Sequence, residues 1–290
     1  MKNKKTITLL VLTIAVLSAF VNIVGLISTG GEGQHDFTAV TGEKVQIYGE
    51  GIYKNDSISV VAQGKAADLV TLVFAVPLLL VALVLATRNS FRGRLLLTGT
   101  LGYFLYTYVS YVFLWSYNQL FLVYVILMSL SIFSFVLSMM TFNTSKISQK
   151  FSDKLPRKFL GGFQIFVAVT IALMWLGRIF ESKVPFGLEH YTTLVIQAMD
   201  LGIVVPVALL SGILLIKKKP YGYLLSSVII IKGITMLAAI CAMIVNSAIE
   251  GIEISMVETV VFSLFTLLAV FSLVILLNNV ELKKYREVGK

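Results

Sequence analysis

The chain has 290 residues, of which 57% are hydrophobic and only 13% are charged. Soluble globular domains carry about half apolar and about a quarter charged residues, so this composition excludes that class and predicts a membrane protein. The single cysteine, Cys241, excludes an intramolecular disulfide and any metal site built on a cysteine cluster. The net charge of +9 is explained by basic connections on one side of a membrane, so no nucleic-acid partner is expected.

Eight apolar runs are long enough to cross a bilayer as helices. The first follows a basic N-terminus and is long for a signal peptide, so it is interpreted as a retained span. The sequence therefore predicts an all-α integral membrane protein with eight transmembrane helices. Their expected ranges are residues 7–28, 68–86, 95–115, 120–142, 159–180, 192–216, 223–245 and 257–277.

Lysine and arginine residues predict the orientation, because short cytoplasmic connections carry an excess of them. Most of the basic residues fall at the two termini or in the connections after the second, fourth and sixth spans. This pattern predicts cytoplasmic termini at both ends in a plasma membrane. The residues are Lys2, Lys4, Lys5, Arg88, Arg92, Arg94, Lys146, Lys150, Lys154, Arg157, Lys158, Lys217, Lys218, Lys219, Lys283, Lys284, Arg286 and Lys290.

Residues 30–67 form the longest polar stretch and are expected to be a small extracytoplasmic cap. Residues 45–48 alternate between apolar and polar side chains, as in a short strand, after a plausible turn at residues 41–44. Asp56 or Ser57 can cap a helix that continues into the second span. Irregular backbone of this kind must lie outside the hydrocarbon, where water satisfies its hydrogen bonds.

The chain divides into two candidate four-helix halves, residues 1–142 and 159–278, joined by a basic connection at 143–158 and followed by a basic tail at 279–290. An offset of 129 residues places Tyr103 opposite Lys232. Asp68 lies opposite Gln197 and aligns with Asp200 only after a three-residue gap. Two explanations stay open: two parallel repeats, as in many carriers, or the shared composition of apolar helices and basic loops. The offset also pairs Pro77 with Pro206, Arg88 with Lys217 and Gly93 with Gly222.

Two charges of opposite sign, Asp200 and Lys232, lie within the adjacent sixth and seventh spans. A charge in the middle of a bilayer costs several kcal/mol unless it is paired or reaches water. At 1.5 Å of rise per residue, Asp200 is expected about 10 Å below the outer surface and Lys232 about 15 Å from the inner end of its span. We expect these residues to bind a solute or ion, or to relay a proton, in a polar cavity. The alternative is a static ion pair, or two separately satisfied side chains, that holds the helices together.

Other polar residues could complete this site. Gln197 lies one turn above Asp200 on the same helix face. Tyr103 and Tyr106 share one face of the third span, and their buried hydroxyls need partners, so they could line the cavity or simply pack helices. Asp68 and Glu258 are expected at the outer mouths of the second and eighth spans. The candidate site is thus Asp200, Lys232, Gln197, Tyr103, Tyr106 and Asp68.

The two histidines, His35 and His190, both lie in outer loops, which excludes a haem held by two histidines inside the membrane. The sequence has no P-loop, no GxSxG and no HExxH, so ATP coupling in this chain is excluded and no cofactor or metal is expected. The leading hypothesis is binding or transport of a small solute or ion. Two alternatives stay open: a non-transporting membrane subunit that docks a partner through its outer loop, and an intramembrane enzyme acting on a lipid-linked substrate through Asp68, Asp200 or Glu258.

Overall fold

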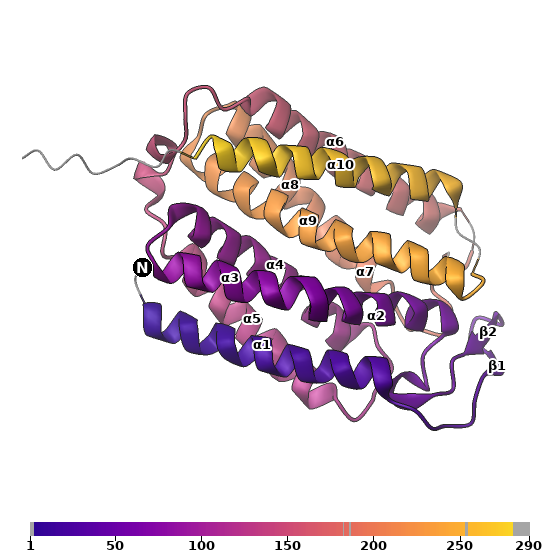
Figure 1. The fold of residues 1–290 in the computed structure, drawn as a ribbon. Coiled ribbons are helices and arrows are strands. Elements are labelled where there is room, and N and C mark those ends of the chain that lie inside the picture. The colour runs from indigo at the N-terminus through magenta and orange to yellow at the C-terminus, as the bar shows by residue number, and fades with distance from the viewer. Residues whose placement is uncertain (1–2, 182, 186, 253–254, 281–290) are drawn as a thin grey trace, which may run out of the picture.

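The computed structural model describes residues 3–181, 183–185, 187–252 and 255–280. Within these ranges the chain forms a bundle of helices that run along one common direction, with a two-stranded hairpin at one end (Figure 1). The helices are α1 (Lys4–Ile27), α2 (Ile58–Val70), α3 (Val76–Thr87), α4 (Phe91–Phe113), α5 (Phe121–Met139), α6 (Arg157–Phe180), α7 (Val195–Met199), α8 (Val205–Ile216), α9 (Pro220–Ile249) and α10 (Met256–Asn278). The strands are β1 (His35–Thr38) and β2 (Lys44–Ile47).

Seven helical runs of the described chain are long and apolar enough to cross a membrane. The all-helical architecture predicted from composition is confirmed, and it fits a multi-pass membrane protein. The helix outside this group is α4, which is 23 residues long but carries several tyrosine, threonine and serine side chains. It packs against α3, α5 and α9, and most of these polar side chains are buried. Because neighbouring helices shield α4, it needs less hydropathy than a helix that faces lipid.

The two ends of the bundle differ in charge. The start of α1 and the end of α10 lie at the same end, together with the connections α3–α4, α5–α6 and α8–α9 (Figure 1). These connections contain the basic clusters, so we call this the basic end. The opposite end carries β1 and β2 and is called the hairpin end. Residues 1–2, and the part of the basic tail from residue 281 onward, lie outside the described residues.

Two of the long helical runs are interrupted by a single π-helical turn. One turn, Thr71–Ala75, joins α2 to α3, and the other, Asp200–Val204, joins α7 to α8. Each is followed two residues later by a proline, Pro77 or Pro206. Proline cannot donate to the preceding turn and its ring crowds that turn, which favours a locally wider helix. The two turns, and the helices that follow them, begin and end exactly 129 residues apart.

The turns that follow α3 and α8, called the corners here, also resemble each other. The residues at the turn, Asn89 and Lys218, both adopt positive φ values, 61° and 56°. A Cβ atom on Gly93 would lie 2.6 Å from the carbonyl carbon of Leu85, and one on Gly222 would lie 2.3 Å from that of Leu214. Only glycine tolerates so close a backbone approach at either corner.

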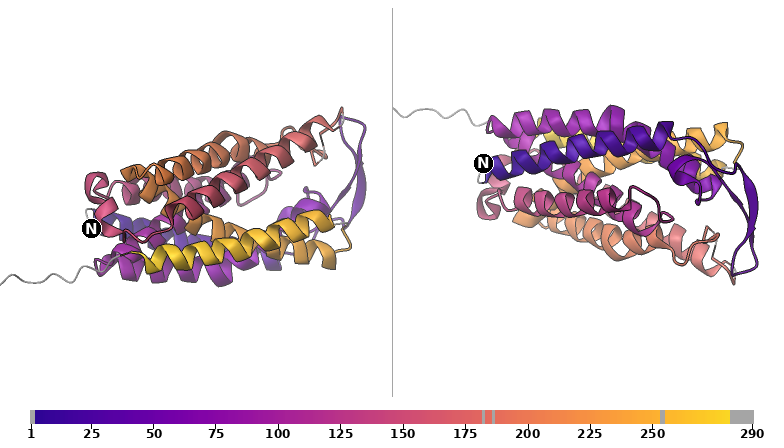
Figure 2. Two further views of the ribbon diagram at one scale, coloured as in Figure 1. Left: turned by 90° about the horizontal axis from the view of Figure 1, so that it is seen from above. Right: turned by 90° about the horizontal axis from the view of Figure 1, so that it is seen from below.

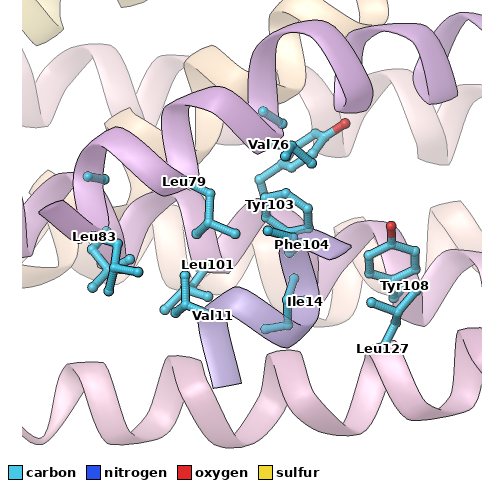
Figure 3. Packing of buried hydrophobic residues seen from close by; sticks show 14 of the residues in the cluster. Val11, Ile14, Val76, Leu79, Leu83, Leu101, Tyr103, Phe104, Tyr108 and Leu127 are labelled. Atoms are coloured by element: carbon cyan, nitrogen blue, oxygen red, sulfur yellow. The ribbon is translucent and has the colours of Figure 1, made fainter. Parts of the chain in front are cut away.

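The helices α1, α3, α4 and α5, which form the first part of the bundle, enclose a continuous apolar core. Val11 and Ile14 of α1 are fully buried with Leu101 and Phe104 of α4, as Figure 3 shows. The second part has a smaller core near the basic end, around Leu224 of α9. Toward the hairpin end α6 and α10 spread apart (Figure 2). The two parts are therefore packed differently, and the looser region lies at the hairpin end of α6–α10.

The outer segment is shorter than the predicted residues 30–67. The helix α2 begins at Ile58, where the side chain of Ser57 caps it by accepting a hydrogen bond from the backbone N–H of Val60. The predicted cap at Asp56 or Ser57 is confirmed at Ser57; the expected outer segment had included the first ten residues of α2, which contain polar residues such as Gln63 and Lys65. The predicted strand at 45–48 corresponds to β2, which pairs antiparallel with β1. Asp68, expected at the helix mouth, consequently lies near the end of α2, ten residues after its start.

Candidate functional site

A cavity of about 620 Å³ occupies the hairpin-end half of the bundle. It lies among α2, α4, α6, α7–α8, α9 and α10, and reaches from Glu43 and Glu189 near the hairpin down to Gln164 of α6. One turn beyond Gln164 the helices close on each other, because a Cβ on Gly161 or Gly212 would lie 2.6 Å from the carbonyl oxygen of the other. The cavity is thus bounded by tight helix packing toward the basic end.

Asp200 lines this cavity from the first position of the second π-helical turn. Its carboxylate accepts one hydrogen bond on each oxygen: Tyr106 Oη of α4 donates to Oδ1 at 2.9 Å, and Trp175 Nε1 of α6 donates to Oδ2 at 2.9 Å. Hydrogen bonds to an ionised acceptor are stronger than neutral ones. Asp200 therefore ties three helical elements together and is already supplied with donors.

Lys232 of α9 lines the same cavity. Its Nζ lies 4.0 Å from the centre of the Tyr106 ring, which is a cation–π contact. Among the described residues, no hydrogen bond or ion pair within 4.0 Å joins this ammonium group to an acceptor, including the carboxylate of Asp200. The two opposite charges share one cavity, and Tyr106 lies between them, with its hydroxyl toward Asp200 and its ring toward Lys232.

A second pair of charges lies nearer the hairpin end of the cavity. Arg178 of α6 forms an ion pair with Glu258 of α10, and its guanidinium group lies 5.3 Å from the centre of the Trp175 ring. Both charged residues line the cavity. Since Trp175 also donates to Asp200, a continuous series of contacts runs from Glu258 on α10 to Asp200 and on to Lys232.

The other predicted residues divide between two places. Gln197 and Tyr103 line the cavity with Asp200, and the Tyr103 hydroxyl is 2.7 Å from Thr71 Oγ1. Trp175, the partner of Asp200 on α6, was not predicted from the sequence. The signal for it was weak: a tryptophan deep in an apolar run needs a hydrogen-bond acceptor for its N–H. Gln164 of α6 is a further buried polar residue that was not predicted from the sequence. Its Oε1 accepts a hydrogen bond from Ser211 Oγ at 2.5 Å.

Asp68 is not among the residues that line the cavity, although it was predicted to share its mouth. It is fully buried, and its carboxylate accepts hydrogen bonds from Tyr53 at 2.7 Å and from Tyr111 at 2.6 Å. The helix α1 approaches so closely that a Cβ on Gly25 would lie 2.1 Å from Asp68 Oδ2. The early start of α2 explains the difference, because it places Asp68 inside the bundle rather than at a helix mouth.

At the hairpin end, the loop before α7 is fastened to the segment before α2. Asp56 Oδ1 accepts hydrogen bonds from the backbone N–H of Ser116 at 2.8 Å and from Tyr191 Oη at 3.1 Å. His190 Nε2 lies 3.0 Å from the carbonyl oxygen of Asn55. Burial raises the pKa of Asp56 to about 6, although the bonds from Ser116 and Tyr191 lower it. We call this set of contacts the latch.

Within the part of the chain that the structure describes, no three His, Cys, Asp or Glu residues come close enough together to hold a metal ion. Deep in the cavity lie the Asp200 carboxylate with its two donors and the Lys232 ammonium group without an acceptor among the described residues, while Arg178, Glu258, Glu43 and Glu189 line the part nearer the hairpin end. Comparisons of the chain with protein-family models, with curated proteins and with solved structures find no match.

Proposed function

We propose that the chain crosses a plasma membrane eight times, with α4 as the additional span and both termini in the cytoplasm. The length of α4 and its place inside the bundle support this count. The orientation is supported by the charge difference between the two ends, because cytoplasmic connections are enriched in lysine and arginine. The hairpin end then faces the outside.

We also propose that residues 1–142 and 159–278 are two parallel repeats. The common offset of the π-helical turns, prolines and corners supports this origin. So does the contact between α4 and α9. A Cβ on Gly99 would meet Ile231 and the carbonyl oxygen of Val228, and these residues are the counterparts, at the same offset, of Gly102 and of Gly99 itself. The contact of Gly99 with Val228 joins two positions that are each other's counterparts, as is expected on a twofold axis between the two helices.

For the activity, we propose binding or transport of a small solute through the cavity. The observation that carries this proposal is the ammonium group of Lys232, which faces a cavity without a hydrogen-bond acceptor from the described chain. Ionisable residues inside a membrane are costly and usually mark a substrate or ion path. A volume of about 620 Å³ also falls within the usual size range of ligand sites.

In this mechanism Lys232 contacts an anionic group of the solute, and Asp200 is its counter-charge or a proton site. Gln197 and Tyr103 supply hydrogen bonds. The cavity extends to the hairpin end and is closed toward the basic end by the Gly161–Gly212 contact, which corresponds to an outward-facing state of a carrier. Helices interrupted at the depth of the site, as at Asp200, are a recurrent feature of transporters.

The test uses purified protein in proteoliposomes and a defined mixture of amino acids, amines, carboxylic acids and phosphate esters that includes long-chain members. Mass spectrometry identifies the compounds that are retained or taken up. We expect Lys232→Met and Asp200→Asn to abolish this enrichment, and Lys217→Met, at the basic end, to leave it intact. An identical profile in the wild type and in both site variants would contradict the proposed function.

A further inference from the structure

Side chains of α6 and α10 meet along one wall of the cavity. The two helices each pack against another neighbour, α6 against α8 and α10 against α9. Three side-chain contacts bridge them: the Arg178–Glu258 ion pair toward the hairpin end, the Phe166–Phe265 ring pair at 5.9 Å, and the Phe159–Phe271 ring pair at 5.7 Å toward the basic end. We call this line of contacts the seam. Figure 2 shows α6 and α10 diverging as they approach the hairpin end.

The same two helices face lipid on one side and the cavity on the other. Phe166 and Leu173 of α6, and Val260 and Leu264 of α10, are exposed on the outside of the bundle. Their neighbours on the inner faces line the cavity: Phe163, Val167 and Ile171 from α6, and Phe262 and Phe265 from α10. One layer of apolar side chains therefore separates the cavity from the surrounding hydrocarbon along the seam.

The charged groups deep in the cavity, away from Glu43 and Glu189 at its hairpin end, favour an anionic ligand group. Both oxygens of Asp200 already accept a hydrogen bond, and Glu258 is paired with Arg178. Lys232 has its ring contact but no acceptor among the described residues. Its N–H donors need acceptors, and a carboxylate or a phosphate supplies them together with a compensating negative charge.

The open mouth at the hairpin end is a poor route for such a ligand. The outer cleft beside it is lined by Glu43, Glu189 and Glu250 against a single Lys44. A cleft with a surplus of negative charge repels an anion that arrives from water. Along the seam Glu258 is paired with Arg178, and the contacts from this pair toward the basic end are between phenylalanine rings.

We propose, building on the binding or transport role above, that the ligand is an amphiphile with a carboxylate or phosphate head group, and that it enters sideways through the seam from the outer half of the bilayer. The head group binds Lys232. The hydrocarbon tail lies along Val167, Ile171 and Phe262. The Arg178–Glu258 pair closes the seam at its outer end and, through Trp175, connects the closure to Asp200.

The first experiment uses wild-type protein in phosphatidylcholine vesicles with two photoactivatable probes, a fatty acid and a phosphatidic acid, each carrying a diazirine in its chain. Peptide mapping by mass spectrometry locates the labelled residues. We expect labelling of the cavity faces of α6 and α10 that falls at least about tenfold in Lys232→Met. Excess acetate or inorganic phosphate in the water should not compete. Competition by these ions would mean that a free anion binds, and it would overturn the proposal, as would labelling that is equal in the variant.

The second experiment closes the seam. In a Cys241→Ser background, the pair Phe166→Cys/Phe265→Cys is joined by a bis-methanethiosulfonate, which a reductant releases. We expect labelling to fall on joining and to return on reduction. The matched pair Phe159→Cys/Phe271→Cys, at the basic end of the seam and beyond the cavity, should label normally when joined. If the unjoined Phe166/Phe265 pair does not fold, Arg178→Cys/Glu258→Cys serves instead.

The outcomes separate the two proposals. If water-soluble solutes are enriched in a Lys232-dependent manner while a joined seam changes nothing, the proposed function stands and lateral access is excluded. If neither the probes nor any component of the solute mixture depends on Lys232, both proposals fail.

Discussion

Asp68 and Asp200 show how one polar arrangement serves two different purposes. Each carboxylate lies at or just before a π-helical turn and accepts one hydrogen bond on each oxygen from an aromatic side chain. The surroundings differ. Asp68 is fully buried under α1, which approaches it at Gly25, whereas Asp200 lines a cavity because α6 stands away from α10.

The positions related by the offset of 129 residues show the same contrast. In the first half Thr71 and Tyr103 are hydrogen-bonded to each other at 2.7 Å. Their counterparts in the second half are Asp200 and Lys232, which do not contact each other directly and share the cavity. A neutral pair can be satisfied inside tight packing, while two charges need space for water or a ligand. The first half therefore packs tightly around its polar pair, whereas Asp200 and Lys232 of the second half border the cavity, with Tyr106 of the first half between them.

The strongest test of this comparison replaces each carboxylate in turn. Asp68→Leu leaves the hydroxyls of Tyr53 and Tyr111 without an acceptor in a closed space, at about 1–3 kcal/mol for each unsatisfied group. Asp200→Leu leaves donors that face a cavity where water can replace the carboxylate. We expect a much larger fall in the thermal unfolding midpoint for Asp68→Leu, measured in detergent. Equal falls in the unfolding midpoint would show that water reaches the donors around Asp200 no better than those around Asp68.

The pH dependence of the latch tests how the open half is fastened to the closed one. Asp56 has a pKa of about 6 in the folded protein, above the ordinary value of 3.8, because it is buried. The folded state thus binds the proton more tightly than the unfolded state, so stability falls as the pH rises from about 4 to 6, by at most about 3 kcal/mol. The unfolding midpoint should be higher at pH 5 than at pH 7.5.

Two variants give this measurement its control. Asp56→Asn keeps a neutral side chain at all pH values, so the difference between pH 5 and pH 7.5 should shrink. Asp36→Asn, in the exposed strand β1, should preserve the wild-type difference. A difference that is unchanged in Asp56→Asn would assign the pH dependence to another group.

Matched glycine substitutions probe the packing itself. Gly25→Ala would place a Cβ against the Asp68 carboxylate, and overpacking of this kind costs about 1–3 kcal/mol. Gly177→Ala in α6 meets nothing within 4 Å and should be neutral or slightly stabilising, because alanine favours a helix. Thermal unfolding of both variants measures the difference. If Gly25→Ala unfolds at the same temperature as the wild type, α1 can move away from Asp68, and the first half is not tightly packed at this point.

Site residues could be predicted from the sequence where a charged side chain interrupts an apolar run. Their hydrogen-bond partners could not be predicted where these partners lie far away in the chain. Asp200 and Lys232 stand out because few charges interrupt the apolar runs, and this rarity needs no structure to notice. The buried partners of Asp68 could not be predicted, because Tyr53 comes from the outer segment and Tyr111 from α4. Trp175 was missed for a related reason: tryptophans in membrane spans often anchor helices at the interface, and only its bond to Asp200 distinguishes it.

The smallest effect distinguishes the two tyrosines that face the site. Tyr103→Phe leaves the Thr71 hydroxyl without its partner inside packed protein, and the loss of such a bond costs about 0.5–1.5 kcal/mol. Tyr106→Phe keeps the ring beside Lys232 and removes only the donor to Asp200, which cavity water can replace. We expect Tyr103→Phe to lower the unfolding midpoint more than Tyr106→Phe, while both variants weaken ligand binding, because both side chains line the cavity. A larger fall in the unfolding midpoint for Tyr106→Phe would place the water-accessible surface beside Tyr103 in the first half. The reason is that the loss of a hydrogen bond destabilises the protein only where water cannot replace the lost partner.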